Sequence, residues 1–258
     1  MYIDTHAHLD DEQFRHEPVE ELLKRAGEKN VRYIIAPAVG TESAAKLMEI
    51  AEQFPNVYFA AGIHAHDALS FFEKEYVTLK KMLAHPKAVA VGEVGLDYFY
   101  NFSPRSMQIH VLRRFVRLSL ITGKPLILHC RDAEQDLYDI LKEENGKLTG
   151  VIHCFSGNEE WAKRFLDLGF YLGFTGAVTF KNSEHTRNVV ATVPSDRILT
   201  ETDAPYMTPA PFRKIKPNEP AFIPVIADKI AEVKGIDSVE AAGIFVENAE
   251  KCFNIKLS

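Results

Sequence analysis

Short apolar runs alternate with longer amphipathic ones along the whole chain. The apolar runs are rich in β-branched residues and predict eight strands, at residues 2–5, 31–37, 57–62, 88–93, 126–129, 150–153, 170–175 and 197–201. Several of these runs, such as residues 33–36 and 126–128, are almost continuously apolar. This pattern is typical of parallel strands that are buried on both faces.

The segments between these runs show helical periodicity. After Pro18, which suits a first helical position, four apolar residues recur at helical spacing: Val19, Leu22, Leu23 and Ala26. Ser103 and Pro104 are typical of an N-cap and a first helical residue, and predict a long helix after them. Asn158 is expected to cap another helix, which Gly169 would end. Two further helices are predicted near residues 224–234 and 238–253.

Eight such alternations predict a parallel α/β fold, either a closed barrel or an open doubly wound sheet. The chain of 258 residues has no internal repeat, low-complexity tract or linker, so we expect one domain over residues 1–258. Residues 205–220 are rich in proline and basic residues and are expected to form one long loop rather than a domain boundary.

The positions of the histidines distinguish between the two architectures. Six of the ten lie at or just after the end of a predicted strand, and these are His6, His8, His64, His66, His129 and His153. Glu93 and Asp203 follow the fourth and eighth strands. Because (β/α)8 barrels, known as TIM barrels, have their active sites at the C-terminal mouth, we predict a single TIM barrel with its active site there.

Paired histidines and isolated carboxylates are the side chains with the clearest chemistry. His6 and His8 are two residues apart, so on an extended chain their imidazoles point to the same side and can bind one ion. An ordinary hydrogen-bonded or surface pair is the alternative. Glu93 lies between an apolar strand and a glycine-flanked turn, where an unpaired carboxylate would be costly. Either an arginine, a helix N-terminus or a pair of bridged ions would offset that cost.

Strand alternation extends this reasoning to the neighbouring residues. Cys130 and Cys154 follow His129 and His153 directly, so they are expected to face the helix layer as small buried residues rather than thiolate ligands. Glu201 and Asp203 share a face, so one could bind a metal while the other supports it. The chain has no GxSxG, GxxxxGK[ST] or GxGxxG motif, which removes the support for serine hydrolase, P-loop or dinucleotide chemistry.

Composition and charge predict the type of chain, its cellular location and how it could bind DNA. Hydrophobic residues make up 46% and charged residues 26% of the chain, which is ordinary globular usage. Three cysteines without CxxC spacing, no signal-like start and no apolar stretch near the ~20 residues of a membrane span predict a reduced, cytoplasmic chain that does not contact membranes. The net charge of -6 gives no overall attraction to polyanions, so DNA would have to be bound locally.

Taken together, these motifs resemble those of the TatD family of metal-dependent deoxyribonucleases, which belongs to the amidohydrolase superfamily. The resemblance covers the chain from residue 3 onwards and rests on six motifs in order: DTHAHLD at 4–10, GIHAHD at 62–67, GEVGLDY at 92–98, HCRDA at 129–133, HCFSG at 153–157 and ETDAP at 201–205.

The resemblance implies two divalent metal ions per chain. His6, His8 and Asp203 would bind the first, His129 and His153 the second, and Glu93 would bridge them. Asp203 would also act as general base, so it and Glu93 are the expected catalytic residues. His64 is expected to contact substrate or support the site rather than bind metal. The residue types leave zinc, magnesium and manganese open.

One segment departs from the family pattern. After the eighth strand the family often has Arg-Gly-Lys-x-Asn-x-Pro, whereas residues 213–220 lack that glycine and are one residue longer. The departure falls where Arg213 and Lys216, together with Arg131 after the fifth strand, are expected to contact phosphate.

The predicted function is hydrolysis of phosphodiester bonds in DNA, because two ions can stabilise both the attacking and the leaving oxygen. A narrow barrel mouth admits single-stranded or frayed ends more easily than duplex, which predicts exonuclease-type cleavage. Two alternatives remain: a hydrolase of a small ester, lactone or amide, whose carbonyl the same ions would polarise, and a barrel that binds without catalysis. The oligomeric state is left open.

Overall fold

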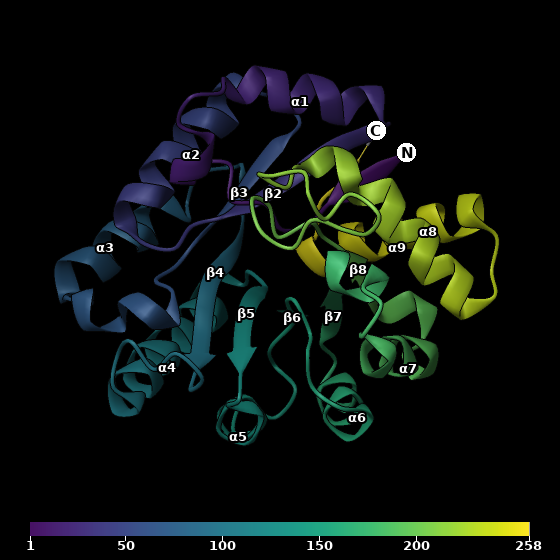
Figure 1. The fold of residues 1–258 in the computed structure, drawn as a ribbon. Coiled ribbons are helices and arrows are strands. Elements are labelled where there is room, and N and C mark those ends of the chain that lie inside the picture. The colour runs from purple at the N-terminus through teal and green to yellow at the C-terminus, as the bar shows by residue number, and fades with distance from the viewer. Residues whose placement is uncertain (258) are drawn as a thin grey trace.

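The centre of the molecule is a single sheet of eight strands, described by a computed structural model over residues 1–257. The strands follow one another in chain order and each pairs in parallel with the next (Figure 1). They are β1 (Tyr2–Asp4), β2 (Val31–Pro37), β3 (Val57–Ala61), β4 (Ala88–Asp97), β5 (Leu126–Arg131), β6 (Gly150–Ile152), β7 (Tyr171–Phe174) and β8 (Ile198–Thr200).

The first and last strands meet through backbone hydrogen bonds just beyond their C-terminal ends. The Thr5 amide donates to the Thr200 carbonyl at 3.2 Å, and the Asp203 amide donates to the His6 carbonyl at 2.9 Å. The two segments continue side by side as far as a parallel bridge between Ala7 and Ala204. The sheet therefore curls into a nearly closed barrel, and the predicted (β/α)8 fold is confirmed.

Helices surround the sheet as an outer layer (Figure 1). They are α1 (Val19–Glu28), α2 (Thr41–Gln53), α3 (Glu73–Met82), α4 (Arg105–Thr122), α5 (Glu134–Lys142), α6 (Glu159–Asp167), α7 (Glu184–Thr192), α8 (Ile223–Lys234) and α9 (Ser238–Phe253). A large cluster of buried apolar residues, including Leu47, Phe59, Phe115 and Phe165, fills the space between strands and helices.

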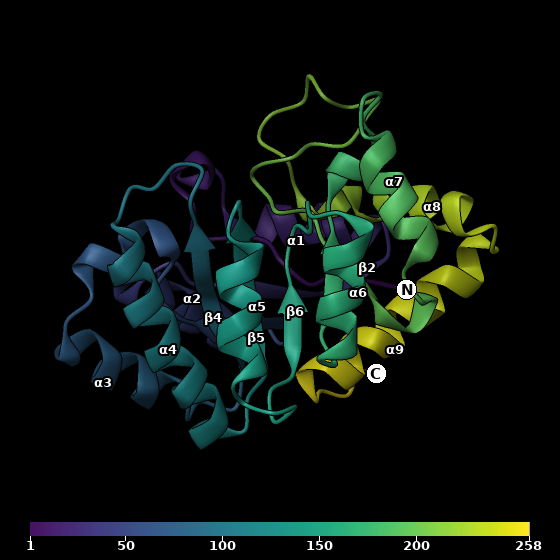
Figure 2. The same cartoon turned by 90° about the horizontal axis from the view of Figure 1, so that it is seen from below.

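The last helix closes one end of the barrel. All eight strands contribute to a second apolar cluster, with residues such as Ile3, Ile35 and Ile127, and Val246 and Phe253 of α9 pack against it. Figure 2 shows α9 at the bottom of the molecule, on the side from which β4 and β6 start. Only the C-terminal end of the barrel is therefore left for a site.

Strand β4 is longer than its sequence predicts. It was expected to end at Glu93 but continues to Asp97, with an irregularity in its pairing to β5 between Val91 and Val94. The continuation requires a glycine at position 95, where a Cβ would collide with the His129 carbonyl oxygen. Glu93 therefore lies within a buried strand rather than at its end, and the chain beyond it stays at the barrel mouth.

The helix starts need two corrections. Pro18 and Pro104 are N-cap residues, one position before the helix, because α1 starts at Val19 and α4 at Arg105. Ser103 does not cap α4: its hydroxyl donates to the His66 carbonyl at 2.7 Å and accepts from the Leu69 amide at 3.1 Å. Asn158, in contrast, caps α6 as predicted, accepting from the Trp161 amide at 2.9 Å.

Replacing Asn158 by alanine should destabilise the protein, because the first turn of α6 loses its side-chain acceptor. The expected loss is about 1 kcal/mol, which corresponds to a melting temperature lower by about 2–4 °C for a chain of this size. Thermal unfolding of Asn158→Ala and Asn158→Asp separates the cap from other effects, since aspartate keeps an acceptor. Equal losses in the two variants would contradict the capping role.

Candidate metal centre

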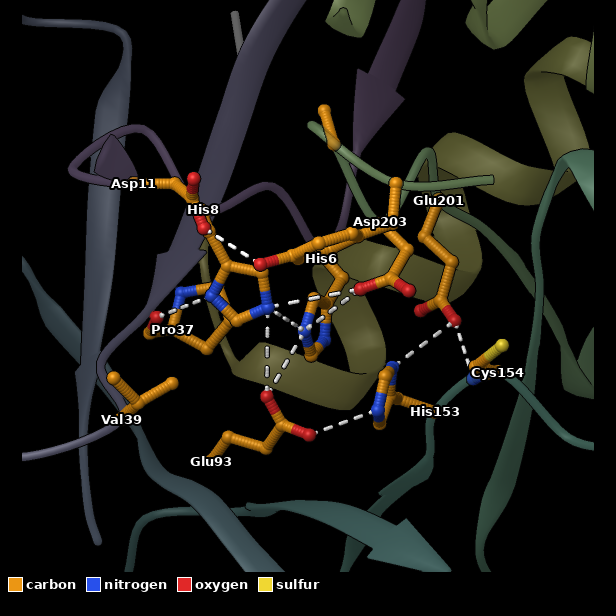
Figure 3. A network of polar contacts seen from close by, with 12 residues as sticks. His6, His8, Asp11, Pro37, Val39, Glu93, His153, Cys154, Glu201 and Asp203 are labelled. Atoms are coloured by element: carbon orange, nitrogen blue, oxygen red, sulfur yellow. Dashed lines mark hydrogen bonds and ion pairs between the residues drawn. The ribbon is translucent and has the colours of Figure 1, made fainter. Parts of the chain in front are cut away.

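Six side chains with metal-binding chemistry converge at the C-terminal mouth of the barrel. Each comes from the end of a strand or the residues just after it, except Glu93, which lies inside β4. They are His6, His8, Glu93, His129, His153 and Asp203, and most of them are drawn in Figure 3. Residues far apart in sequence meet because parallel strands all end at the same edge.

The first group of donor atoms surrounds one oxygen of Glu93. The Nε2 atoms of His6 and His8 are 3.2 Å apart. They lie 3.3 and 3.6 Å from Glu93 Oε2, and 3.8 and 3.6 Å from Asp203 Oδ1 (Figure 3). Four donor atoms from three strands of the barrel thus enclose one small space.

A second group of donor atoms surrounds the other oxygen of the same carboxylate. Glu93 Oε1 lies 3.2 Å from His129 Nδ1 and 2.9 Å from His153 Nε2, and these two nitrogens are 3.3 Å apart. His64 Nε2 also lies 3.3 Å from Glu93 Oε1, so this histidine is about as close to the Glu93 carboxylate as His129. A supporting or substrate-binding role was expected for His64, but its position is equally that of a donor atom.

The spacing of these atoms suits metal ions. Four ligands at about 2.0–2.1 Å from a tetrahedral ion are separated from one another by about 3.3 Å. The distances in both groups scatter around that value. Glu93 is only 2% exposed, so its charge is removed from water and needs cations or imidazoles close by. The donor set therefore fits a pair of divalent ions.

A buried carboxylate that the sequence did not reveal holds His129. The Nε2 atom of this ring, opposite the one that faces Glu93, lies 3.0 Å from Asp97 Oδ2. His66 Nε2 approaches the same oxygen at 3.0 Å. A carboxylate on the second ring nitrogen fixes the orientation of a histidine and increases its basicity as a ligand. Asp97 lies in the GEVGLDY motif at 92–98, but that motif did not predict its contact with His129.

Similar contacts orient the other rings. His8 Nδ1 lies 3.2 Å from the Pro37 carbonyl, which can only accept a hydrogen bond, so this contact orients the ring with Nε2 towards the donor group (Figure 3). Glu201 Oε1 lies 3.6 Å from His153 Nδ1 and accepts from the Cys154 amide. A glycine at position 173 makes room for Glu201, whose carboxylate would be within 2.5–2.7 Å of a Cβ there. Glu201 thus supports the site while Asp203 faces it.

A further buried carboxyl group, that of Asp4, ties the first and last strands together at the site. It accepts from the His6 amide at 3.2 Å and from the Thr202 amide at 3.0 Å. Burial raises the pKa of Asp4 to about 8. Asp4 is the first residue of the DTHAHLD motif, two positions before His6, but the motif did not predict its contacts.

Electrostatics in the site favour anionic carboxylates. Burial opposes the ionisation of Glu93, yet the neighbouring imidazoles, His153 first, hold its pKa well below the usual range. Burial likewise opposes the ionisation of Asp203, but a hydrogen bond from His8 lowers its pKa. Both carboxylates therefore carry charge at neutral pH, as ligands of a cation must.

The expected packing of the two cysteines needs a correction. Cys130 packs against the large apolar cluster between the strands and the helices, but it is partly exposed. Cys154 has a left-handed backbone, with φ of 46°, so strand alternation no longer sets its direction. Its Sγ lies 3.7 Å from the Thr175 hydroxyl, and burial raises the pKa of the thiol to about 12. The thiol is therefore protonated at neutral pH.

The expected phosphate contacts lie around the mouth and outside the donor groups. The Arg131 guanidinium lies 4.0 Å from the centre of the Phe99 ring, and that of Arg213 lies 3.7 Å from the centre of the Phe180 ring. Residues 212–216, which include Lys216, are exposed. Figure 2 shows the loop after β8 rising above the rest of the mouth.

This loop is fixed at its base. Asn218 is fully buried, and its amide donates to the Pro205 carbonyl at 2.9 Å. The Asn218 side chain donates to the Thr202 carbonyl at 2.9 Å. Glu219 then pairs with Arg25 of α1 at 2.7 Å. The departure from the family pattern therefore lies in an exposed loop with anchored ends.

A parallel barrel with a histidine and carboxylate cluster at its C-terminal mouth defines the class of barrel hydrolases that work with metal ions. The chain belongs to the TatD related DNase family, whose model matches residues 3–254. The family expected from the six motifs is thereby confirmed.

Relatives and solved structures agree with this assignment over nearly the whole chain. The chain is 41% identical to the uncharacterised metal-dependent hydrolase YabD of Bacillus subtilis, over 99% of this chain and 100% of that protein. It is 34% identical to the 3′-5′ ssDNA/RNA exonuclease TatD of Cronobacter sakazakii, over 92% and 95%. The crystal structure of YjjV, a TatD homologue from Escherichia coli K12, superposes with a TM-score of 0.92 at 32% identity, over 99% and 98%.

Two substitutions should separate the two donor groups. Glu93→Gln removes the charge that both groups share, so at least one ion per chain should be lost. Asp97→Asn leaves the first group intact and should weaken only the ion beside His129, by about 10–100-fold. Metal content after dialysis, measured by elemental analysis alongside circular dichroism, gives the result. Two retained ions and normal turnover in folded Glu93→Gln protein would contradict the bridging role.

Proposed function

We propose that the barrel, acting as one domain, hydrolyses phosphodiester bonds in DNA and works from single-stranded or frayed ends. The observation that carries this proposal is the position of Glu93, whose two oxygens each contact a separate group of donor atoms. A paired arrangement of this kind suits in-line displacement at phosphorus. The exonuclease name of the Cronobacter relative supports the choice of substrate.

The proposed mechanism assigns different tasks to the two catalytic carboxylates. When bound, two divalent ions neutralise the charge that develops on the phosphate and make water more acidic. Asp203 faces the first donor group from the chain after β8 and takes the proton of the attacking water as general base. Glu93 holds the two groups at a fixed separation. Histidine donors favour zinc, and the carboxylates also accept magnesium or manganese.

The substrate is held by residues around the mouth. We assign Arg131, Arg213 and Lys216 to phosphate contacts. We assign His64, which lies beside Glu93, to a substrate contact next to the donor groups. The exposed loop after β8 carries Arg213 and Lys216 above the mouth, where an incoming strand would pass (Figure 2). No helix within residues 1–257 is both long and apolar enough to cross a membrane. Three free cysteines support a reducing, cytoplasmic location.

Chelation should abolish activity, and a divalent ion should restore it, because the donor groups then hold no cation to lower the pKa of the attacking water. Metal-stripped protein is reconstituted separately with zinc, magnesium and manganese and assayed on end-labelled single- and double-stranded DNA. Single-stranded ends should be cut faster than intact duplex. Full activity of the stripped protein would contradict metal dependence. Turnover of a small ester or lactone without any cleavage of DNA would favour the alternative function.

Neutralising the loop after β8 should weaken DNA binding and reduce its dependence on salt. In Arg213→Gln/Lys216→Gln protein, the slope of log affinity against log salt should fall by about one unit for each lost phosphate contact. A matched variant, Arg113→Gln/Lys163→Gln, removes one arginine and one lysine from the outer helices α4 and α6 and should keep the parent slope. Identical slopes for all three proteins would place the phosphate contacts elsewhere.

A further inference from the structure

Three aromatic side chains are exposed at the barrel mouth, where β4 passes into α4. The exposed fractions of Phe99, Tyr100 and Phe102 are 57%, 48% and 64%. They belong to one short segment, residues 98–104, and form a contiguous group. Exposed aromatic groups of this kind mark binding sites more often than a scatter of single apolar residues does.

Two of the rings are stacked on each other, the third meets one of them edge-on, and a cation lies over the group. Tyr100 and Phe102 are stacked, with ring centres 5.3 Å apart and an interplanar angle of 19°. Phe99 meets Tyr100 edge-on at 4.9 Å. The Arg131 guanidinium lies 4.0 Å from the centre of the Phe99 ring and 4.8 Å from that of Tyr100. The Arg131 side chain is partly exposed, so its charge is available to a ligand.

This surface is connected to the metal centre through one carboxylate. The Tyr100 amide donates to Asp97 Oδ1 at 2.8 Å, while Asp97 Oδ2 contacts His129 Nε2 at 3.0 Å. His66 lies between the two regions: its ring is 4.8 Å from Phe102 and 6.0 Å from His129. The aromatic surface and a metal donor are therefore held at a fixed separation by the same side chain.

We propose that Phe99, Tyr100 and Phe102 form a stacking platform for nucleobases of a single-stranded nucleic acid, with Arg131 binding an adjacent phosphate. The inference rests on the proposed function and deepens it. Every nucleobase has a flat π-face, and stacking on aromatic side chains stabilises a bound base whatever the sequence. The Arg131 guanidinium, which lies over the Phe99 and Tyr100 rings, supplies the charge that a neighbouring phosphate needs.

The platform accounts for the preference for single-stranded ends and for binding of DNA by an acidic chain. Bases in an intact duplex are already stacked and paired, so only unpaired bases can lie on these rings, which favours single-stranded ends. The chain also has a net charge of -6, so long-range attraction contributes little. Stacking supplies affinity that does not depend on the overall charge.

The test is a cycle that removes the rings and the bases separately. Binding is measured by fluorescence anisotropy with single-stranded oligonucleotides whose phosphorothioate linkages slow cleavage. One oligonucleotide carries normal bases and the other has abasic sites at its terminal nucleotides. The proteins are the parent, Tyr100→Leu/Phe102→Leu, and the control Phe72→Leu, which changes an exposed phenylalanine at the start of α3, outside the platform.

The double variant should lose affinity for the normal oligonucleotide by about tenfold or more, and lose much less for the abasic one. The control should match the parent with both. Equal losses for the two oligonucleotides would overturn the platform alone. A changed oligomeric state in sedimentation, without any base-dependent loss, would also overturn it and identify the rings as a protein contact. A parent protein that binds neither oligonucleotide would overturn the proposed function as well.

Discussion

The site depends on a buried carboxylate that is shared by two sets of imidazoles. Glu93 is nearly inaccessible to water, and each of its oxygens lies within hydrogen-bonding or ion-pair distance of different histidines. An isolated charge in this position would cost several kcal/mol. The charge is tolerated because imidazoles approach from both sides, and this requirement fixes where the ends of β1, β5 and β6 must lie.

The scaffold meets this requirement by placing a carboxyl group behind several of the donors. Asp97 holds His129, Glu201 lies beside His153, and Asp4 binds the backbone of His6 and of Thr202. These groups come from the same strands as the donors, so the barrel that positions one also positions the other. The irregular pairing of β4 extends this strand far enough to bring Asp97 and the aromatic segment to the mouth.

Local patterns, apolar runs followed by histidine or a carboxylate, predicted the strand order and the candidate donor residues. The assignment of these residues to two ions came from the resemblance to the family. The contacts of Asp97 and His66 were not predicted, although both residues lie in the quoted motifs, because these contacts depend on a strand that continues past an irregularity that no local pattern marks. Cys154 departed from strand alternation through its left-handed backbone. Ser103 resembled a helix cap but bonds the preceding loop instead, since tertiary contacts outweigh its local preference.

Asn218 closes the loop after β8 at its base, where its side chain binds the Thr202 carbonyl and its backbone the Pro205 carbonyl, on either side of Asp203, while Glu219 is tied to α1. Residues 211–216, between these anchor points, are exposed. They can therefore change without displacing the donor side chains. Insertions, deletions and changes of charge can accumulate there during evolution without altering the chemistry below. Because its ends are anchored, the loop could be exchanged as a unit between relatives. Substrate preference could then be redesigned while the donor residues below stay unchanged.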